Sequence, residues 1–331
     1  MIILGIETSC DETSASVLKD GKILTNVVNT QLIHTKYGGV VPSLASKNHE
    51  KLINHIVDKA VNDSKIKLSD IDAIAVTQGP GLIGSLMVGL NYAKGLSVGL
   101  DKPIIGVSHL EGHLFSGLID NSINFPYICL LVSGGHTQIW QVNGFNNYKI
   151  LSTTVDDAAG EAFDKGARIL GLKYPGGPEI EKAAKNGNIK KYHFTIPYVK
   201  SNPLNFSFSG MKTALLYLTN KFTQNDLNKE LANIAASYQE SIIDSLLNKL
   251  SDILDIYNTS NVLIAGGVSA NKRFRVKSNK LEEDKNIKIH FPDFKYCTDN
   301  AAMIAMVGYK KMLIDDISDL NILPFSSIEH A

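Results

Sequence analysis

The chain carries the same order of strand and turn signals twice, and this repeat constrains its fold more than any other feature. In each copy, short apolar runs are separated by short turns, three of the four containing glycine, which is typical of strands that follow one another directly in a sheet. The predicted strands are residues 2–7, 14–19 and 22–28 in the first copy and 127–133, 136–142 and 148–154 in the second. The predicted turns are Asp20-Gly21, Gly134-Gly135 and Asn143-Gly144. The repeat predicts two related halves, each opening with a three-stranded meander.

Apolar residues at helical spacing follow each meander and alternate with further short strands. The predicted helices are residues 48–62, 83–99, 159–170, 208–221, 229–256, 269–283 and 299–313. The predicted later strands are residues 71–76, 104–107, 261–266 and 287–291. This order is typical of an α/β protein in which each domain has a mixed sheet flanked by helices, with a cleft between the domains as the default binding site.

The length of 331 residues exceeds the usual size of one compact domain, which favours two. We predict an N-terminal domain over residues 1–125 and a C-terminal domain over residues 126–298. The segment 299–331 is predicted to pack back on the first domain. The polar stretch 175–205 is predicted to be an irregular insertion, either a lid or a binding surface.

Composition limits the partners and the compartment of the chain. The 33 basic and 33 acidic residues give a net charge of zero, so a nucleic-acid partner would have to be bound by a local patch. Cys10, Cys129 and Cys297 are odd in number and lack CxxC spacing, which fits three buried thiols in a reducing compartment. The sequence shows no leader and no long apolar span, so we expect a soluble cytoplasmic protein without a membrane segment.

Two histidines with helical spacing are the strongest candidates for metal ligands. His109 and His113 are four residues apart, so on a helix their imidazoles lie on one face and a divalent metal could bridge them. The zinc-protease motifs need a glutamate beside one histidine, where this chain has Leu110 and Gly112, so peptidase chemistry is disfavoured. If the fold brings Asp299 to the pair, the two nitrogens and one carboxylate form a catalytic metal pattern with open positions. The structural alternatives are a shared helix surface for the histidines and a helix N-cap for Asp299.

Glycine turns at the ends of predicted strands suggest a nucleotide site. Leu131-Val-Ser-Gly-Gly135 and Gly266-Gly-Val-Ser-Ala-Asn271 offer backbone N–H groups that no Cβ screens, and the second turn opens a helix. A third segment, Tyr174-Pro-Gly-Gly-Pro178, could approach a ribose or base. In the turn after the first strand, Asp11 and Glu12 could hold a cation or orient a nucleophile, although acidic residues are also common in ordinary turns.

These residues resemble one known family closely, the universal tRNA threonylcarbamoyladenosine transferases, which were known earlier as O-sialoglycoprotein endopeptidases. The resemblance runs from about residue 3 to 315. The motifs that carry it are Gly5-Ile-Glu-Thr-Ser-Cys-Asp-Glu-Thr13, Tyr37-Gly-Gly-Val-Val-Pro42, Gly79-Pro-Gly-Leu82, His109-Leu-Glu-Gly-His113, Leu131-Val-Ser-Gly-Gly-His-Thr137, Gly160-Glu-Ala-Phe-Asp-Lys165, Tyr174-Pro-Gly-Gly-Pro178, Phe206-Ser-Phe-Ser-Gly210 and Gly266-Gly-Val-Ser-Ala-Asn271. The resemblance implies an actin-like, Hsp70-like ATPase fold of two duplicated domains.

The resemblance also implies a reaction, in which the threonylcarbamoyl group of threonylcarbamoyl-AMP moves to N6 of the adenosine at position 37 of tRNAs that decode ANN codons, with release of AMP. The resemblance implies one divalent metal, with Fe²⁺ as the first candidate and Zn²⁺ as the second. The implied ligands of this metal are His109, His113 and Asp299. The implied adenylate-binding residues are Leu131, Val132, Ser133, Gly134, Gly135, Asp164, Gly177 and Asn271, with Glu181 at the ribose. The family usually has other residues at the positions of Glu181, Ser43, Lys47 and Ser108. These differences bear on the ribose contact of Glu181 and on contacts with tRNA or a partner around residues 43–47.

The implied partners are those of the bacterial proteins, an inactive paralogue that forms a heterodimer and a small P-loop ATPase. In the implied acyl transfer, Asp11 or Glu12 could accept the proton of the attacking amine. Two alternatives remain at this point. One is an ATP-dependent kinase or ATPase of the same fold, although such enzymes hold Mg²⁺ with carboxylates rather than histidines. The other is a non-catalytic actin-like scaffold, which would bind neither metal nor adenylate.

Overall fold

The computed structural model describes residues 1–120 and 123–327. The chain divides into two compact units. Unit 1 comprises Met1–Ser122 and Asp299–Ala331, and unit 2 comprises Ile123–Thr298. The last part of the chain therefore belongs to the same unit as the first part.

Unit 1 is built on a five-stranded mixed sheet in the order β3-β2-β1-β4-β5. The strands are β1 (Ile2–Glu7), β2 (Glu12–Lys19), β3 (Lys22–Thr30), β4 (Ala73–Gly79) and β5 (Ile104–Ser108). The first three form the predicted antiparallel meander, and Asp20 and Gly21 in the tight turn both have positive φ, as such a turn requires. Strands β4 and β5 run parallel to β1.

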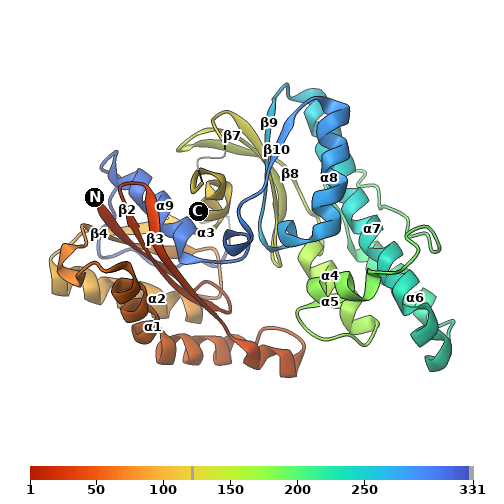
Figure 1. Ribbon diagram of the computed structural model, residues 1–331, viewed down its shortest axis with the longest axis horizontal. Coiled ribbons are helices and arrows are strands. Elements are labelled where there is room, and N and C mark those ends of the chain that lie inside the picture. Colours follow the sequence, from red (N-terminus) through yellow and green to blue (C-terminus); the bar gives the residue numbers. More distant parts are fainter. Residues whose placement is uncertain (121–122, 328–331) are drawn as a thin grey trace. The chain divides into compact units, whose positions relative to one another are not determined.

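Helices cover both faces of this sheet (Figure 1), namely α1 (Pro42–Ser64), α2 (Ile83–Leu100), α3 (His109–Leu114) and α9 (Ala301–Met312). Successive residues of β1 point to opposite faces. Leu4 and Ile6 pack with Ile53 of α1 and Leu90 of α2 in one core. Gly5, between them, faces α9 on the other side.

Close packing fixes α9 against the sheet. A Cβ at Gly5 would lie 2.5 Å from the carbonyl oxygen of Ala301, and one at Gly308 would lie 2.3 Å from Cβ of Ala75. Glycine and alanine at these positions let the helix backbone approach the strands. The N-cap of the helix is Asn300, whose side chain accepts a hydrogen bond from the backbone N–H of Met303 at 3.2 Å. The residue before this cap is Asp299, so its position is tied to a well-packed helix.

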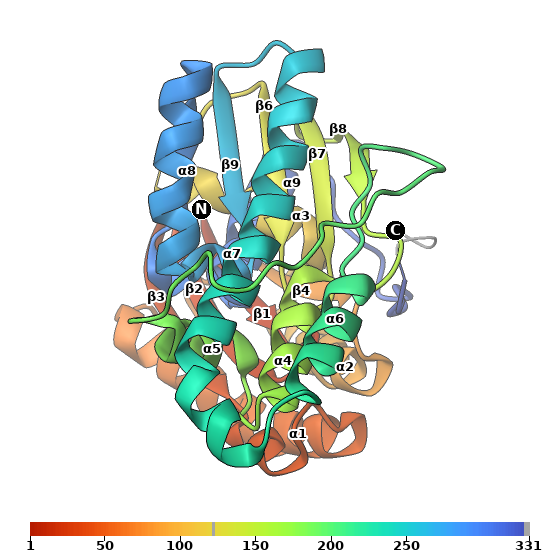
Figure 2. The same ribbon diagram turned by 90° about the vertical axis from the view of Figure 1, so that its right-hand side faces the viewer.

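Unit 2 has a second five-stranded mixed sheet, in the order β10-β9-β6-β7-β8. Its strands are β6 (Tyr127–Val132), β7 (Thr137–Gly144), β8 (Asn147–Thr153), β9 (Asn261–Ala265) and β10 (Lys288–His290), and its helices are α4 (Ala159–Ile169), α5 (Gly176–Ala184), α6 (Ser209–Thr219), α7 (Gln224–Ile256) and α8 (Lys272–Lys285). Residues of all five helices pack with one face of the sheet in a single core, and Figure 2 shows α7 in front of β9 and β6. The meander of β6, β7 and β8 repeats that of unit 1.

The structure corrects several details of the sequence prediction. The stretch 175–205 is not irregular throughout, because α5 lies within it and buries Ile180 and Ala184 in the core. Helix α1 begins at Pro42, six residues before the predicted start. The hairpin between β7 and β8 turns at Phe145-Asn146 instead of Asn143-Gly144, since Gly144 still pairs with Asn147.

Two further expectations concern the thiols and the membrane. Cys129 and Cys297 are buried as predicted, but Cys10 is half-exposed, and none of the three is in a disulfide. Within residues 1–120 and 123–327, no helix is long and apolar enough to cross a lipid bilayer.

Candidate active site

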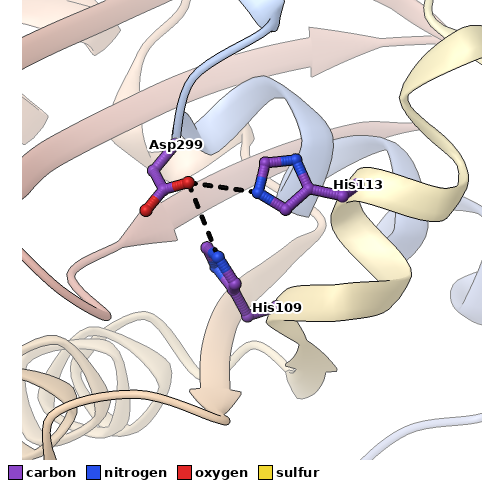
Figure 3. A group of neighbouring side chains, drawn as sticks. All are labelled: His109, His113 and Asp299. Atoms are coloured by element: carbon purple, nitrogen blue, oxygen red, sulfur yellow. Dashed lines mark hydrogen bonds and ion pairs between the residues drawn. The ribbon is translucent and has the colours of Figure 1, made fainter. Parts of the chain in front are cut away.

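The predicted metal ligands meet in unit 1. His109 and His113 lie one turn apart on α3, which starts directly after β5 and is opened by a capping box between Ser108 and Glu111. Asp299 lies just before the cap of α9. Figure 3 shows both imidazoles directed at the Asp299 carboxylate. Asp299 is therefore not the N-cap of α9, which was the structural alternative, because Asn300 occupies that position.

The distances from Asp299 to the two histidines fit a coordination site, and the three possible ligand atoms all lie within 4.8 Å of one another. Oδ1 of Asp299 lies 3.1 Å from Nε2 of His113 and 3.5 Å from Nε2 of His109. Ligands about 2.0–2.1 Å from one tetrahedral metal are themselves about 3.3 Å apart, which is close to both values. His109 and His113 are almost fully buried, and Asp299 is about one-fifth exposed. The three residues could hold a metal ion with positions left open for a substrate.

Carboxylates outnumber other charges around the two histidines. Burial alone would lower the pKa of His109, but the charges of Asp299 and Glu7 and a hydrogen bond to Glu7 raise it to about 9. Burial, together with the charges of Asp299 and Asp11, raises the pKa of Glu12 well above its ordinary value. The charges of Asp299 and Glu7 therefore favour a positive charge on His109.

Glu7 was not singled out by the sequence prediction. Burial raises the pKa of this carboxyl, but the His109 charge and hydrogen bond outweigh that effect and lower it overall. Its Oε2 lies 3.0 Å from Nδ1 of His109, on the side of the ring away from Asp299. The one available signal was a charged residue at the end of an otherwise apolar strand, Ile2–Glu7.

Asp11 and Glu12 are adjacent in sequence but lie in different local structures. Asp11 is in the turn after β1, and its carbonyl accepts a hydrogen bond from the backbone of Gln31 at 3.0 Å. Glu12 is half-buried and is the first residue of β2, so it is part of the sheet and not of the turn.

The predicted adenylate-binding residues all lie in unit 2. Most are at the end of a strand or the start of a helix, whereas Asp164 and Glu181 lie within α4 and α5. The Ser133-Gly134-Gly135 turn connects β6 and β7, and Gly134 and Gly135 are exposed. The start of α4 touches this turn, because Gly160 donates a hydrogen bond to the Ser133 carbonyl at 3.2 Å. Gly266 has φ of +88°, and a Cβ there would lie 2.5 Å from the Val132 carbonyl oxygen. The turn at Gly266 therefore lies beside the end of β6, where the Ser133-Gly134-Gly135 turn begins.

The other adenylate candidates link helices α4, α5, α7 and α8. Asp164 accepts a hydrogen bond from the backbone N–H of Gly176, next to Gly177, at 2.6 Å. Glu181 accepts one from the backbone N–H of Lys272 at 2.9 Å. Asn271 caps α8 and donates to Gln239 at 2.8 Å. A cavity of about 770 Å³ lies beside these contacts and is lined by Glu181, Gln239, Lys272 and Arg273 among others. Its volume is in the range of ligand sites.

The architecture is similar to solved structures at low sequence identity. The activator of the 2-hydroxyisocaproyl-CoA dehydratase from Clostridium difficile, solved with bound ADPNP, matches with a TM-score of 0.54 and 15% identity over 96% of this chain and 99% of that chain. HypF of T. kodakarensis matches with a TM-score of 0.67 and 14% identity, over 95% of this chain but only 48% of that longer chain. The fold is that of the actin-like ATPases, and here it carries a possible two-histidine, one-carboxylate metal site.

Sequence comparison gives a narrower assignment. The family model for tRNA N6-adenosine threonylcarbamoyltransferase matches residues 22–306. Proteins of that description are 51% identical in Thermosipho africanus, over 98% of this chain and 99% of the relative, and 44% identical in Clostridium perfringens, over 97% and 96%. The chain belongs to this family. It is a transferase that forms threonylcarbamoyladenosine in tRNA, as the sequence motifs predicted.

Proposed function

We propose that the chain transfers the threonylcarbamoyl group from threonylcarbamoyl-AMP to N6 of the adenosine at position 37 of tRNAs that decode ANN codons. The N6 amine attacks the carbonyl carbon, a carbon–nitrogen bond forms, and the bond from this carbon to the phosphate oxygen breaks. AMP leaves and one proton is lost from N6. The family assignment supports this reaction, and the grouping of His109, His113 and Asp299 is the structural observation that carries it.

His109, His113 and Asp299 would hold one divalent metal per chain. Two imidazole nitrogens and one carboxylate with open positions suit Fe²⁺ as the first candidate and Zn²⁺ as the second. When bound, such an ion supplies Lewis-acid polarisation of the group being transferred. The buried imidazoles orient the site, and the partly exposed Asp299 leaves one side of it accessible.

Unit 2 would bind the adenylate. The exposed Gly134 and Gly135 offer backbone N–H groups to the phosphate, with Leu131, Val132 and Ser133 shaping the turn. Asp164, Gly177, Glu181 and Asn271 would contact the nucleoside beside the cavity of about 770 Å³. Since Glu181 already accepts a hydrogen bond from Lys272, a ribose hydroxyl would have to use the rest of its carboxylate. The C. difficile activator of similar fold was solved with bound ADPNP, which supports nucleotide binding by a protein of this architecture.

Asp11 or Glu12 would accept the proton that N6 loses. Both belong to the segment that follows β1, and burial, followed by the charges of Asp299 and Asp11, raises the pKa of Glu12. Single-turnover transfer by Asp11→Ala and by Glu12→Ala tests this role. Unchanged rates in both variants would end the assignment.

The remaining proposals concern domains, partners and compartment. We propose that the two compact units correspond to the two actin-like domains. A chain with zero net charge would share tRNA binding with partners, an inactive paralogue and a small P-loop ATPase. Three cysteines outside any disulfide suit a cytoplasmic protein.

The decisive test is transfer of label from radiolabelled threonylcarbamoyl-AMP to an ANN-decoding tRNA, with the partner proteins present. We expect transfer by the wild type, none by the double variant His109→Ala/His113→Ala, and normal transfer by His193→Ala, which removes an exposed histidine of unit 2. ATP turnover without transfer by the wild type would instead favour a kinase or ATPase.

A further inference from the structure

Glu7 is a buried charge whose position the proposed reaction does not yet explain. Its side chain is fully inaccessible to solvent at the end of β1. Burying a carboxylate costs several kcal/mol unless hydrogen-bond donors surround it. A carboxylate kept at such a cost in the core has a specific partner.

Three donors converge on this carboxylate. One oxygen, Oε1, accepts from the backbone N–H of Ser9. The other, Oε2, accepts from the hydroxyl of Thr77 at 2.7 Å and lies 3.0 Å from Nδ1 of His109. An ionised carboxylate can only accept hydrogen bonds, so Nδ1 of His109 must carry a proton. The lone pair of the neutral imidazole is then on Nε2, the atom that faces Asp299.

We propose that Glu7 is the positioning residue of the metal site: it holds the His109 ring and its tautomer so that Nε2 can bind the metal. Histidine ligands commonly donate their second N–H to a carboxylate, which fixes the ring and makes it a stronger ligand. His113 differs, because its buried Nδ1 has no hydrogen-bond partner in the part of the chain that the structure describes. Of the two imidazole rings, therefore, only that of His109 is oriented by a carboxylate at Nδ1 among the described residues. This inference depends on the proposed metal site.

Ser9 is the rival explanation, since its Oγ lies 3.2 Å from the same Nδ1. If the Ser9 hydroxyl donated to Nδ1, however, the Nδ1 lone pair would face Oε2 of Glu7 at 3.0 Å, which is repulsive. A glutamine in place of Glu7 cannot satisfy all three donors. Its NH₂ group would face either the Ser9 N–H or Nδ1 of His109. In the second arrangement Nδ1 must accept a hydrogen bond, so the proton of the neutral imidazole lies on Nε2 and the tautomer is reversed.

The first experiment measures zinc affinity of the chelator-stripped full chain by competition with a chromophoric chelator. We expect Glu7→Gln to bind zinc about 10–100-fold more weakly than the wild type. Ser9→Ala should remain within a few-fold of the wild type. Glu230→Gln, the same substitution far from His109 in sequence and in unit 2, should not change the affinity. Wild-type affinity in Glu7→Gln, or an equally large loss in Ser9→Ala, would overturn the proposal.

The second experiment needs no variant at Glu7 and so survives if Glu7→Gln fails to fold. Long-range ¹H–¹⁵N spectra of the zinc-loaded wild type should show His109 protonated on Nδ1 and zinc-bound through Nε2. The opposite tautomer would refute the role of Glu7. The zinc affinity of His113→Ala distinguishes a failure of the proposed metal site from a failure of the positioning role. Wild-type affinity in His113→Ala would show that the proposed metal site is wrong. A loss of affinity in His113→Ala with no loss in Glu7→Gln would show that only the positioning role of Glu7 is wrong.

Discussion

At the scale of single residues, the pair of candidate metal ligands on α3 could be predicted from the sequence because the spacing between them is local. Helical periodicity brings His109 and His113 onto one face whatever the rest of the fold does. Asp299 could be named only on the condition that the fold brought it there, since it is 186 residues from His113. Glu7 was missed for a related reason. Its contact with His109 spans 102 residues, and nothing local separates it from a turn acid.

Metal binding should show directly in stability, because a ligand that binds only the folded state stabilises it. Zinc added to the chelator-stripped chain at a free concentration of about 100 times Kd should raise the free energy of unfolding by about 2.7 kcal/mol. The measurement is denaturant unfolding with and without zinc. His113→Ala should lose this increase and His193→Ala should keep it. An equal increase in His113→Ala would place the bound ion elsewhere.

At the scale of elements, the meanders were predictable because alternation and turn residues are local signals. The start of α1 and the whole of α5 were not. Helix α5 is short, and it opens with Gly176-Gly177-Pro178, residues that usually interrupt helices. Its formation depends on tertiary contacts, the hydrogen bond from Gly176 to Asp164 and the burial of Ile180. Sequence patterns report such contacts poorly.

The seating of α9 on β1 can be tested with one methyl group. Gly5→Ala places a Cβ 2.5 Å from the Ala301 carbonyl oxygen, so the helix must move, and overpacking of this kind costs about 1–3 kcal/mol. Because Asp299 precedes α9, zinc affinity should fall as well. Gly95→Ala on α2 is the matched control, since no described atom lies within 4 Å of its Cβ. It should raise stability by about 0.5–1 kcal/mol. Thermal melts of both variants measure the change in stability, and zinc titration measures the change in affinity.

A pH-sensitive contact links helix α7 to the segment between α5 and α6. Hydrogen bonds from Lys191, Asn233 and Tyr192 lower the pKa of Glu230 from its ordinary 4.5 to about 2. A carboxyl with a lowered folded-state pKa stabilises the fold above pH 4.5, and this contribution disappears as the pH falls from about 4.5 to about 2.

The stability difference between the wild type and Glu230→Gln should therefore be constant above pH 5 and shrink toward zero near pH 2. Denaturant unfolding at a series of pH values measures it. Glu50→Gln, which alters an exposed carboxylate of α1, controls for the general effect of charge removal. A difference that stays constant down to pH 2 would contradict the assigned contact.

At the scale of the whole molecule, the two units differ in how much of the chain they require. Unit 2 is one continuous segment with its own core, whereas unit 1 needs both the beginning and the last part of the chain. We expect residues 123–298 expressed alone to unfold cooperatively in a thermal melt. Residues 1–122 alone should not, because one face of their sheet would lack the buried helix α9. A cooperative melt of the 1–122 fragment would show that α9 is dispensable.

The late position of Asp299 also orders events during protein synthesis. Both histidines are made first, and the ribosome must then add 186 residues, including all of unit 2, before the third ligand exists. In the proposed metal site, a nascent chain would lack the third ligand until Asp299 has been made. Loading of the complete site would then follow synthesis of unit 2, and a chain that stops before Asp299, from a nonsense codon or a cleaved message, would offer only the two histidines.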